Sequence, residues 1–155
     1  MGNGKRKKKR YQVGDVFLIP SSGGGYYVGQ VAVDTKAEIG APFCYLFDKD
    51  VSKEDDFEKL DLSASKIISA AFITPELIEH SHWEIFANKP VSVHSALSDV
   101  TAFRNKNFIG AVIRGASLVA EYLDTYYGVI SESVWPDPDY VLKFFMRPRP
   151  QAKPH

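Results

Sequence analysis

The hydrophobic and polar positions of the chain alternate between short apolar runs and polar connections. Most of these runs are only four to nine residues long and rich in β-branched and aromatic side chains, as is typical of strands. The segments predicted to be extended are residues 16–19, 26–34, 42–48, 66–74, 83–86 and 140–146. Weaker extended or apolar patterns occur at residues 91–94 and 108–113. The first predicted strand is apolar on both faces, so we expect both of its faces to be buried.

Helical periodicity is strongest in residues 115–128. Val119, Tyr122, Leu123 and Tyr126 recur there at spacings of three and four, which places them on one face of a helix. Gly128 suits the position that follows a helix C-terminus. A second, short helix is expected after Thr74 and Pro75, an N-cap residue followed by a proline suited to the first turn.

About six short strands and one clear helix predict an α+β, mostly β protein. We expect a small, strongly bent antiparallel sheet or an SH3-like partial barrel with one packed C-terminal helix. The 155 residues suggest a single globular domain at 11–146. It would be flanked by a disordered basic tail at 1–10 and a Pro- and Arg-rich tail at 147–155.

Three consecutive glycines lie between the first two predicted strands, in the stretch SSGGG that starts at Ser21. A phosphate-binding loop needs a helix directly after its glycines, so that free backbone N–H groups face the anion. The residues that follow, YYVGQVAV, are strand-like instead. The glycines are therefore expected to form the turn of a hairpin.

The net charge of zero conceals a strong segregation of charges. Residues 5–10 carry six positive charges, and Arg147, Arg149 and Lys153 carry three more. All 19 acidic residues lie between Asp15 and Asp139, against ten Lys and Arg in residues 11–146. Such an acidic body repels nucleic acid and attracts basic partners, so nucleic acid is an unfavoured partner.

Few residues suggest catalysis or cofactor binding. His80 and His82 lie near Glu76 and Glu79 but have no clear third metal ligand, so no metal or other cofactor is expected. No GxSxG sequence occurs. The single cysteine, Cys44, lies in an apolar run, which favours a buried thiol and a reducing, cytoplasmic location. None of these groups by itself establishes an active site, and no small-molecule substrate is expected.

Membrane association is not expected either. No apolar run reaches about 18 residues, the length that a membrane-spanning helix requires. The N-terminus also lacks the apolar stretch of a signal peptide.

The most distinctive charged feature is the acidic segment, defined as residues 48–61. It is either a solvated loop or a docking surface for a basic protein, because charge complementarity speeds association and selects partners. The residues predicted to bind such a partner are Asp48, Asp50, Glu54, Asp55, Asp56, Glu58 and Asp61.

The opening VGDVFLIP, followed by a Gly-containing loop and YYVGQV, resembles the start of the bacterial immunity protein 26 family. The later ITPELIEHSHWEIFANKP and YVLKFF are compatible with further strands of that family. The residues that carry the resemblance are Gly14, Asp15, Phe17, Ile19, Pro20, Tyr27, Gly29, Gln30 and Val31.

This resemblance implies a mostly β protein that protects its cell by binding a polymorphic toxin, without catalysis of its own. Many such toxins are basic nucleases, and the acidic body agrees with such a partner. The opening also resembles the first strand of MazF/Kid-type endoribonucleases, which have an SH3-like barrel. Those enzymes need positive charge near the scissile phosphate, whereas this chain has no arginine between Tyr11 and Phe103. A third possibility is a barrel-type module that binds nucleic acid through the basic tail.

Overall fold

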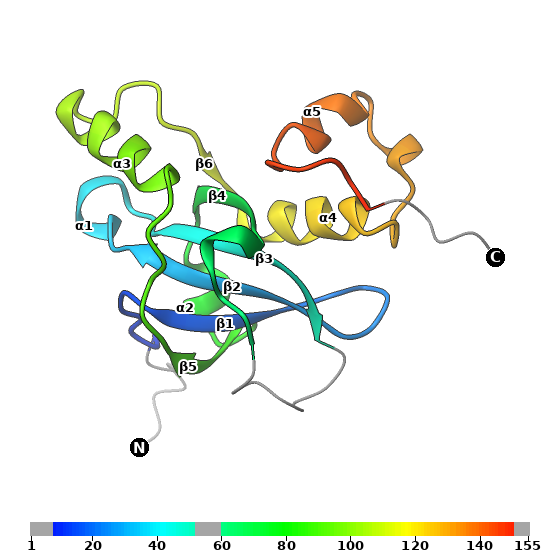
Figure 1. The fold of residues 1–155 in the computed structure, drawn as a ribbon, viewed down its shortest axis with the longest axis horizontal. Coiled ribbons are helices and arrows are strands. Elements are labelled where there is room, and N and C mark those ends of the chain that lie inside the picture. Colours follow the sequence, from blue (N-terminus) through cyan, green and yellow to red (C-terminus); the bar gives the residue numbers. More distant parts are fainter. Residues whose placement is uncertain (1–7, 52–59, 151–155) are drawn as a thin grey trace, which may run out of the picture.

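The structure is a computed structural model that describes residues 8–51 and 60–150, with residues 49–51 described by their backbone alone. Six strands form one sheet in the order β5-β1-β2-β3-β4-β6 (Figure 1). The strands are β1 (Asp15–Pro20), β2 (Tyr26–Val33), β3 (Phe43–Val51), β4 (Ile67–Ile73), β5 (Glu84–Asn88) and β6 (Ile113–Arg114). The helices are α1 (Lys36–Ile39), α2 (Glu76–Glu79), α3 (Ala96–Asn105), α4 (Ala116–Tyr126) and α5 (Pro138–Leu142).

Neighbouring strands run antiparallel except at one edge, where β6 is parallel to β4. The sheet is therefore mixed, and it stays open instead of closing into a barrel. The α+β, mostly β expectation is confirmed. The one departure is the parallel pairing of β6 with β4, where an antiparallel sheet was expected.

The three glycines turn the β1–β2 hairpin, as the sequence predicted. Within this turn the Ser21 N–H donates to the Gly25 carbonyl at 3.0 Å, and the Gly24 N–H donates to the Ser21 carbonyl at 3.1 Å. Gly24 and Gly25 have φ angles of +92° and +75°, which residues with a side chain rarely adopt. The glycine run is thus explained by backbone geometry.

Both faces of the sheet are covered, so the protein has three layers. One core cluster lies between the sheet and the helices α2, α4 and α5, and the other lies between the sheet and α3. In β1, every residue from Asp15 to Ile19 is buried, which confirms the prediction that this strand is covered on both sides.

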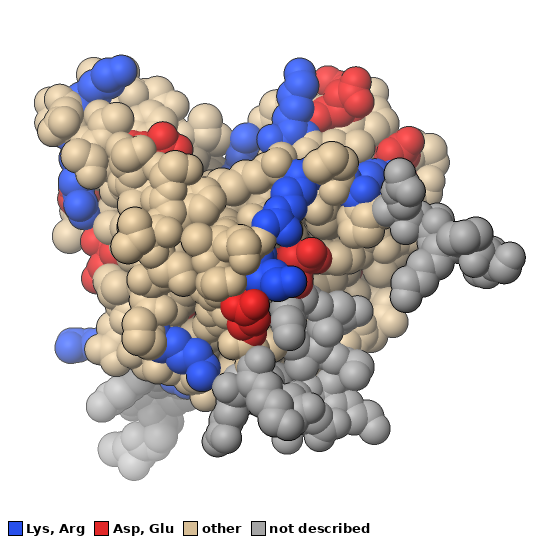
Figure 2. All heavy atoms as spheres, viewed as in Figure 1, with Lys and Arg blue, Asp and Glu red and all other residues tan. Residues whose placement is uncertain are grey.

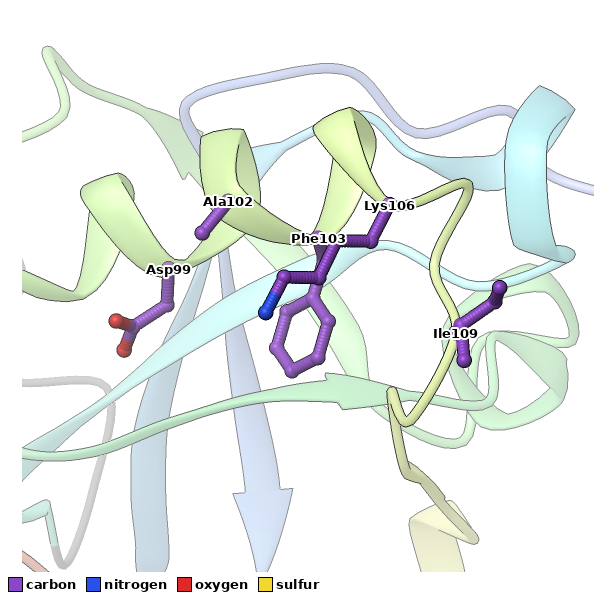
Figure 3. Close-up of a pocket in the computed structure, with 5 residues that line it drawn as sticks. All are labelled: Asp99, Ala102, Phe103, Lys106 and Ile109. Atoms are coloured by element: carbon purple, nitrogen blue, oxygen red, sulfur yellow. The ribbon is translucent and has the colours of Figure 1, made fainter.

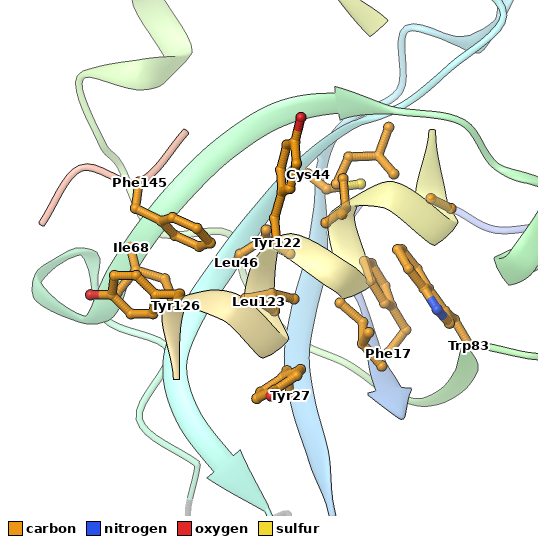
Figure 4. Close-up of a cluster of buried hydrophobic side chains, with 14 of the residues drawn as sticks. Phe17, Tyr27, Cys44, Leu46, Ile68, Trp83, Tyr122, Leu123, Tyr126 and Phe145 are labelled. Atoms are coloured by element: carbon orange, nitrogen blue, oxygen red, sulfur yellow. The ribbon is translucent and has the colours of Figure 1, made fainter. Parts of the chain in front are cut away.

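Helix α4 supplies much of the first cluster (Figure 4). Its side chains Tyr122, Leu123 and Tyr126 pack over Leu46 and Ile68 of the central strands. Three- and four-residue spacing brings them to the same side of the helix. The predicted helix at 115–128 is confirmed, and Gly128 follows its end with a φ of +78°.

Two elements differ from the prediction. Residues 140–146, expected as a final strand, form most of helix α5 and a turn after it. Asp137 caps this helix by accepting the Tyr140 N–H, and Pro138 occupies its first turn. Helix α3 was not predicted, and no strand forms at 91–94. No helix in the described ranges is long and apolar enough to cross a membrane.

The predicted tails fall largely outside the described residues, which begin at Lys8 and end at Pro150. Near the start of the described chain, the Lys9 N–H donates to the Glu79 carbonyl at 2.8 Å. The last part of the basic segment is therefore attached to α2.

Candidate functional site

The acidic segment begins within β3, at Asp48. Glu54, Asp55, Asp56 and Glu58 lie outside the described residues, and Asp50 is described only as a backbone position in β3. The structure therefore places the side chains of two of the predicted partner-binding residues, Asp48 and Asp61.

Asp48 joins the end of β3 to the C-terminal end of α4. Its Oδ1 accepts a hydrogen bond from the Tyr127 hydroxyl at 2.7 Å, and its Oδ2 lies 3.9 Å from Nη1 of Arg147. Burial and this bond to Asp48 raise the pKa of the Tyr127 phenol far above its ordinary value, so Tyr127 remains a donor. Asp48 thus anchors the base of the acidic segment, and its charge is partly offset by Arg147.

Asp61 lies at the other end of the segment and is exposed. Its Oδ1 accepts the Ser63 N–H at 3.0 Å, a local turn in which an aspartate bonds the backbone two residues ahead. This acid is accessible to a partner, whereas Asp48 is largely engaged within the protein.

A buried carboxylate that the sequence did not single out organises the same end of the sheet. Asp124 of α4 is 4% exposed and accepts hydrogen bonds from three hydroxyl groups and one backbone N–H of the β1–β2 hairpin. The donors are the hydroxyls of Ser21, Ser22 and Tyr27 and the Ser22 N–H. A buried carboxylate needs such donors to offset its desolvation, so the network is structural.

The two anchors are connected through stacked tyrosines. The ring of Tyr27, which bonds Asp124, lies 5.2 Å from the ring of Tyr127, which bonds Asp48. The hairpin turn, the end of β3 and the end of α4 are therefore held as one unit around Asp48, where the acidic segment begins.

The residues that carried the family resemblance support the fold. Gly14 has a φ of +93°, and a Cβ there would lie 2.8 Å from the Lys89 carbonyl. The Asp15 carboxylate accepts bonds from the Asn88 side chain and the Gln12 N–H, which fixes the start of β1. The side-chain amide of Gln30 donates to the Lys89 carbonyl at 2.9 Å.

The remaining residues of this set are Phe17, Ile19, Pro20, Tyr27, Gly29 and Val31. Phe17, Ile19, Tyr27 and Val31 are buried in the first core cluster. Pro20 is exposed where β1 ends, and Gly29 leaves room for the Phe17 ring. These residues of the opening sequence therefore specify the hairpin and its packing.

Groups considered for other chemistry have structural explanations. Among the described residues, no group of three or more His, Cys, Asp or Glu is arranged to hold a metal ion. His80 and His82 are exposed, and the buried Glu79 is paired with Lys36. Cys44 is fully buried, and burial raises its pKa, so the thiol stays protonated.

A family model for immunity protein 26 matches residues 12–108, well over half of the chain. The chain belongs to the immunity protein 26 family. The resemblance in the opening sequence is thereby confirmed, and membership implies an immunity protein directed against a polymorphic toxin. Neither the curated proteins nor the solved structures contain a significant match.

The match to immunity protein 26 covers β1 to β5 and α1 to α3. It ends at residue 108, so β6, α4 and α5 lie beyond it, as does the YVLKFF sequence that we expected to match a further strand of the family. In this chain those later elements nevertheless complete the first core cluster.

Proposed function

We propose that this protein neutralises a cognate toxin by binding it, without catalysis, and that the toxin is a basic nuclease domain attracted by the acidic body. The observation that carries the proposal is the match to the immunity protein 26 family. The excess of 19 acidic over ten basic residues in residues 11–146 supports the expected sign of the partner's charge.

Several acids of the described chain are already paired. Glu38 binds Arg104, Glu79 binds Lys36, and Glu132 binds Arg149. Asp15 and Asp124 are buried, so their charges are not offered at the surface. The remaining acidic excess therefore falls mainly on the acidic segment and on scattered exposed acids, which makes the segment the favoured region for attracting a basic toxin.

Charge of this kind acts chiefly on the association rate. Opposite charges steer the encounter over distances comparable to the Debye length, about 8–10 Å at physiological salt. We propose that Asp50, Glu54, Asp55, Asp56, Glu58 and Asp61 supply this attraction, with Asp48 holding the base of the segment.

The direct test mixes the purified protein with the toxin domain encoded beside its gene, and measures binding and protection of cells. Reversal of Asp55, Asp56 and Glu58 to Lys should slow association by about tenfold at low salt, with a smaller effect at high salt. A matched variant with Glu76, Glu84 and Glu121 reversed carries the same change in net charge. It should slow association less if the acidic segment is the contact region.

Two results would contradict the proposal at different levels. Absence of binding to, and of protection against, every neighbouring toxin would exclude the immunity function. Equal slowing by the two triple variants would keep the function but assign the attraction to the whole body.

A further inference from the structure

At the outer edge of the described sheet, β6 presents backbone groups that point away from β4. The Thr74 N–H donates to the Arg114 carbonyl at 2.9 Å, so the Arg114 carbonyl faces β4. Successive residues of a strand point their backbone groups in opposite directions, so the Ile113 N–H and C=O face outward. In the described part of the sheet no strand lies beyond β6.

Exposed apolar side chains gather at this edge. Ile109, Val112 and Ile113 are 76%, 55% and 41% exposed. The opposite edge strand, β5, differs because its exposed residues are the polar Glu84 and Asn88. Exposed apolar residues that gather in this way are typical of interaction sites, and scattered ones are not.

The loop before β6 presents these side chains through an unusual backbone. Asn107 and Phe108 have φ angles of +53° and +61°, and positive values are rare for a residue as bulky as phenylalanine. Phe108 turns inward, with its ring 6.0 Å from the ring of Phe72, and Ile109 is left exposed. Strained backbone of this kind is often maintained at binding sites.

A pocket of about 290 Å³ lies beside Ile109 (Figure 3). Ala102 and Phe103 of α3 give it an apolar wall, and Asp99 and Lys106 add a charge of each sign. The pocket is large enough to accept a side chain from a partner that lies along β6.

The other side of this edge is formed by an ordered arginine and a tyrosine. Arg114 donates from Nη1 to the Tyr140 hydroxyl at 2.7 Å, and its guanidinium lies 5.4 Å from the Tyr140 ring. Tyr140 is itself 54% exposed. Figure 2 shows the surface hollowed between the part that carries α3 and the part that carries α5. We call this surface the β6 slot, formed by Ile109, Val112, Ile113, Arg114 and Tyr140.

We propose that the β6 slot receives an extended, apolar segment of the cognate toxin, which pairs with Ile113 as an added strand and places a side chain in the neighbouring pocket. This inference rests on the proposed function. In strand addition, main-chain hydrogen bonds give affinity and side-chain pockets give specificity. The slot offers the main-chain groups, and the neighbouring pocket can accept a side chain. Tyr and Arg, two of its residues, are frequent in the energetic centres of interfaces.

A second copy of this chain is a poorer occupant. A symmetric dimer uses the same patch on both molecules, so that patch must be complementary to itself, whereas a hollow surface does not fill another hollow.

The slot residues lie beyond residue 108, where the family match ends, whereas four of the five residues that line the neighbouring pocket lie within it. The matched part therefore supplies five of the six strands and most of the pocket, and the slot is added by the chain that follows it. This arrangement suits a surface that selects one toxin among those opposed by related immunity proteins.

The slot and the acidic segment occupy opposite ends of the strands. β6 pairs with Phe72 and Ile73, and Phe72 lies beside Phe43 at the start of β3. The acidic segment begins at Asp48, towards the other end of β3. We therefore assign steering to the acidic segment and retention of the bound toxin to the slot.

The test compares the dissociation rates of single variants from the toxin domain encoded beside this gene. Ile109→Asp and Val112→Asp should each raise the dissociation rate about tenfold or more, with little change in association, because they place a charge in an apolar contact. Val93→Asp is the matched control, since Val93 is 87% exposed and lies outside the slot. In the complex of the unmodified protein, hydrogen exchange at the Ile113 amide should slow.

Normal dissociation of both slot variants, or unchanged exchange at Ile113 in a complex that forms, would overturn this inference while leaving the proposed function intact. A dimer in sedimentation velocity that Val112→Asp dissociates would also overturn it, by assigning the slot to a second copy. If the unmodified protein binds no neighbouring toxin, the proposed function and this inference are both overturned.

Discussion

At the scale of single residues, Gly29 shows how the hairpin depends on one missing side chain. A Cβ at this position would lie 2.5 Å from two atoms of the Phe17 ring, which itself stacks on Trp83 at 5.5 Å. We predict that Gly29→Ala lowers the free energy of unfolding by about 1–3 kcal/mol, because a buried, stacked ring cannot move away cheaply. Urea denaturation measures this change. Gly115→Ala is the control, since a methyl group there would have no atom within 4 Å and the φ of Gly115 is −66°.

Asp124 is the second residue on which the hairpin depends. Asp124→Asn keeps the size of the side chain but replaces one acceptor oxygen by a donor that faces hydroxyl groups. We predict a loss of about 1–3 kcal/mol of stability, because a buried polar group is left badly paired. The Ser22 amide should also exchange faster in a hydrogen-exchange experiment. Asp139→Asn, at an exposed position of α5, should change neither quantity.

At the scale of elements, α4 lies outside the family match and yet belongs to the core. Leu123 is fully buried against the sheet. We predict that Leu123→Ala destabilises the protein by about 2–5 kcal/mol, the usual cost of a cavity in a packed core. Leu97→Ala, at a half-buried position of α3, should cost less. If Leu123→Ala and Leu97→Ala lowered stability equally in thermal or urea unfolding, the conclusion that α4 contributes more to the core than α3 would be contradicted.

The sequence predicted elements well where one local pattern dominated. The strands around the glycine turn, and α4 with its three- and four-residue spacing, were identified because periodicity and turn residues agreed. Helix α5 was mistaken for a strand because a short apolar run such as YVLKFFM suits either element, although Asp137 and Pro138 are typical of a helix start. Helix α3 was missed because few of its residues are apolar and buried.

Anchoring residues and surfaces assembled from several elements were harder to predict for a different reason. Asp124 accepts hydrogen bonds from Ser21 and Ser22, which lie about a hundred positions earlier in the sequence. Only the folded chain therefore shows that its carboxylate has hydrogen-bond donors. The β6 slot likewise depends on Tyr140 approaching Arg114 from a separate element. Charge runs are visible in a sequence, whereas surfaces assembled from distant segments are not.

At the scale of the whole molecule, the acidic segment and the β6 slot should act independently on the toxin. Along β3, the five steps from Phe43, which pairs with Phe72, to Asp48, where the acidic segment begins, span roughly 16 Å at about 3.3 Å per residue. Sites that far apart without shared partners contribute additively to binding. We predict that a variant combining the Asp55, Asp56 and Glu58 reversals with Val112→Asp changes Kd by the product of the two separate changes, within about twofold.

Binding kinetics over a range of salt concentrations tests this independence. The combined variant should show the slow, salt-sensitive association of the charge reversals together with the fast, salt-insensitive dissociation of Val112→Asp, because screening weakens steering between exposed charges far more than a desolvated apolar contact. A combined effect well below the product would mean that the acidic segment and the slot meet the same part of the toxin. The toxin would then be attracted and held through a single contact region, although the acidic segment and the slot are separated along β3.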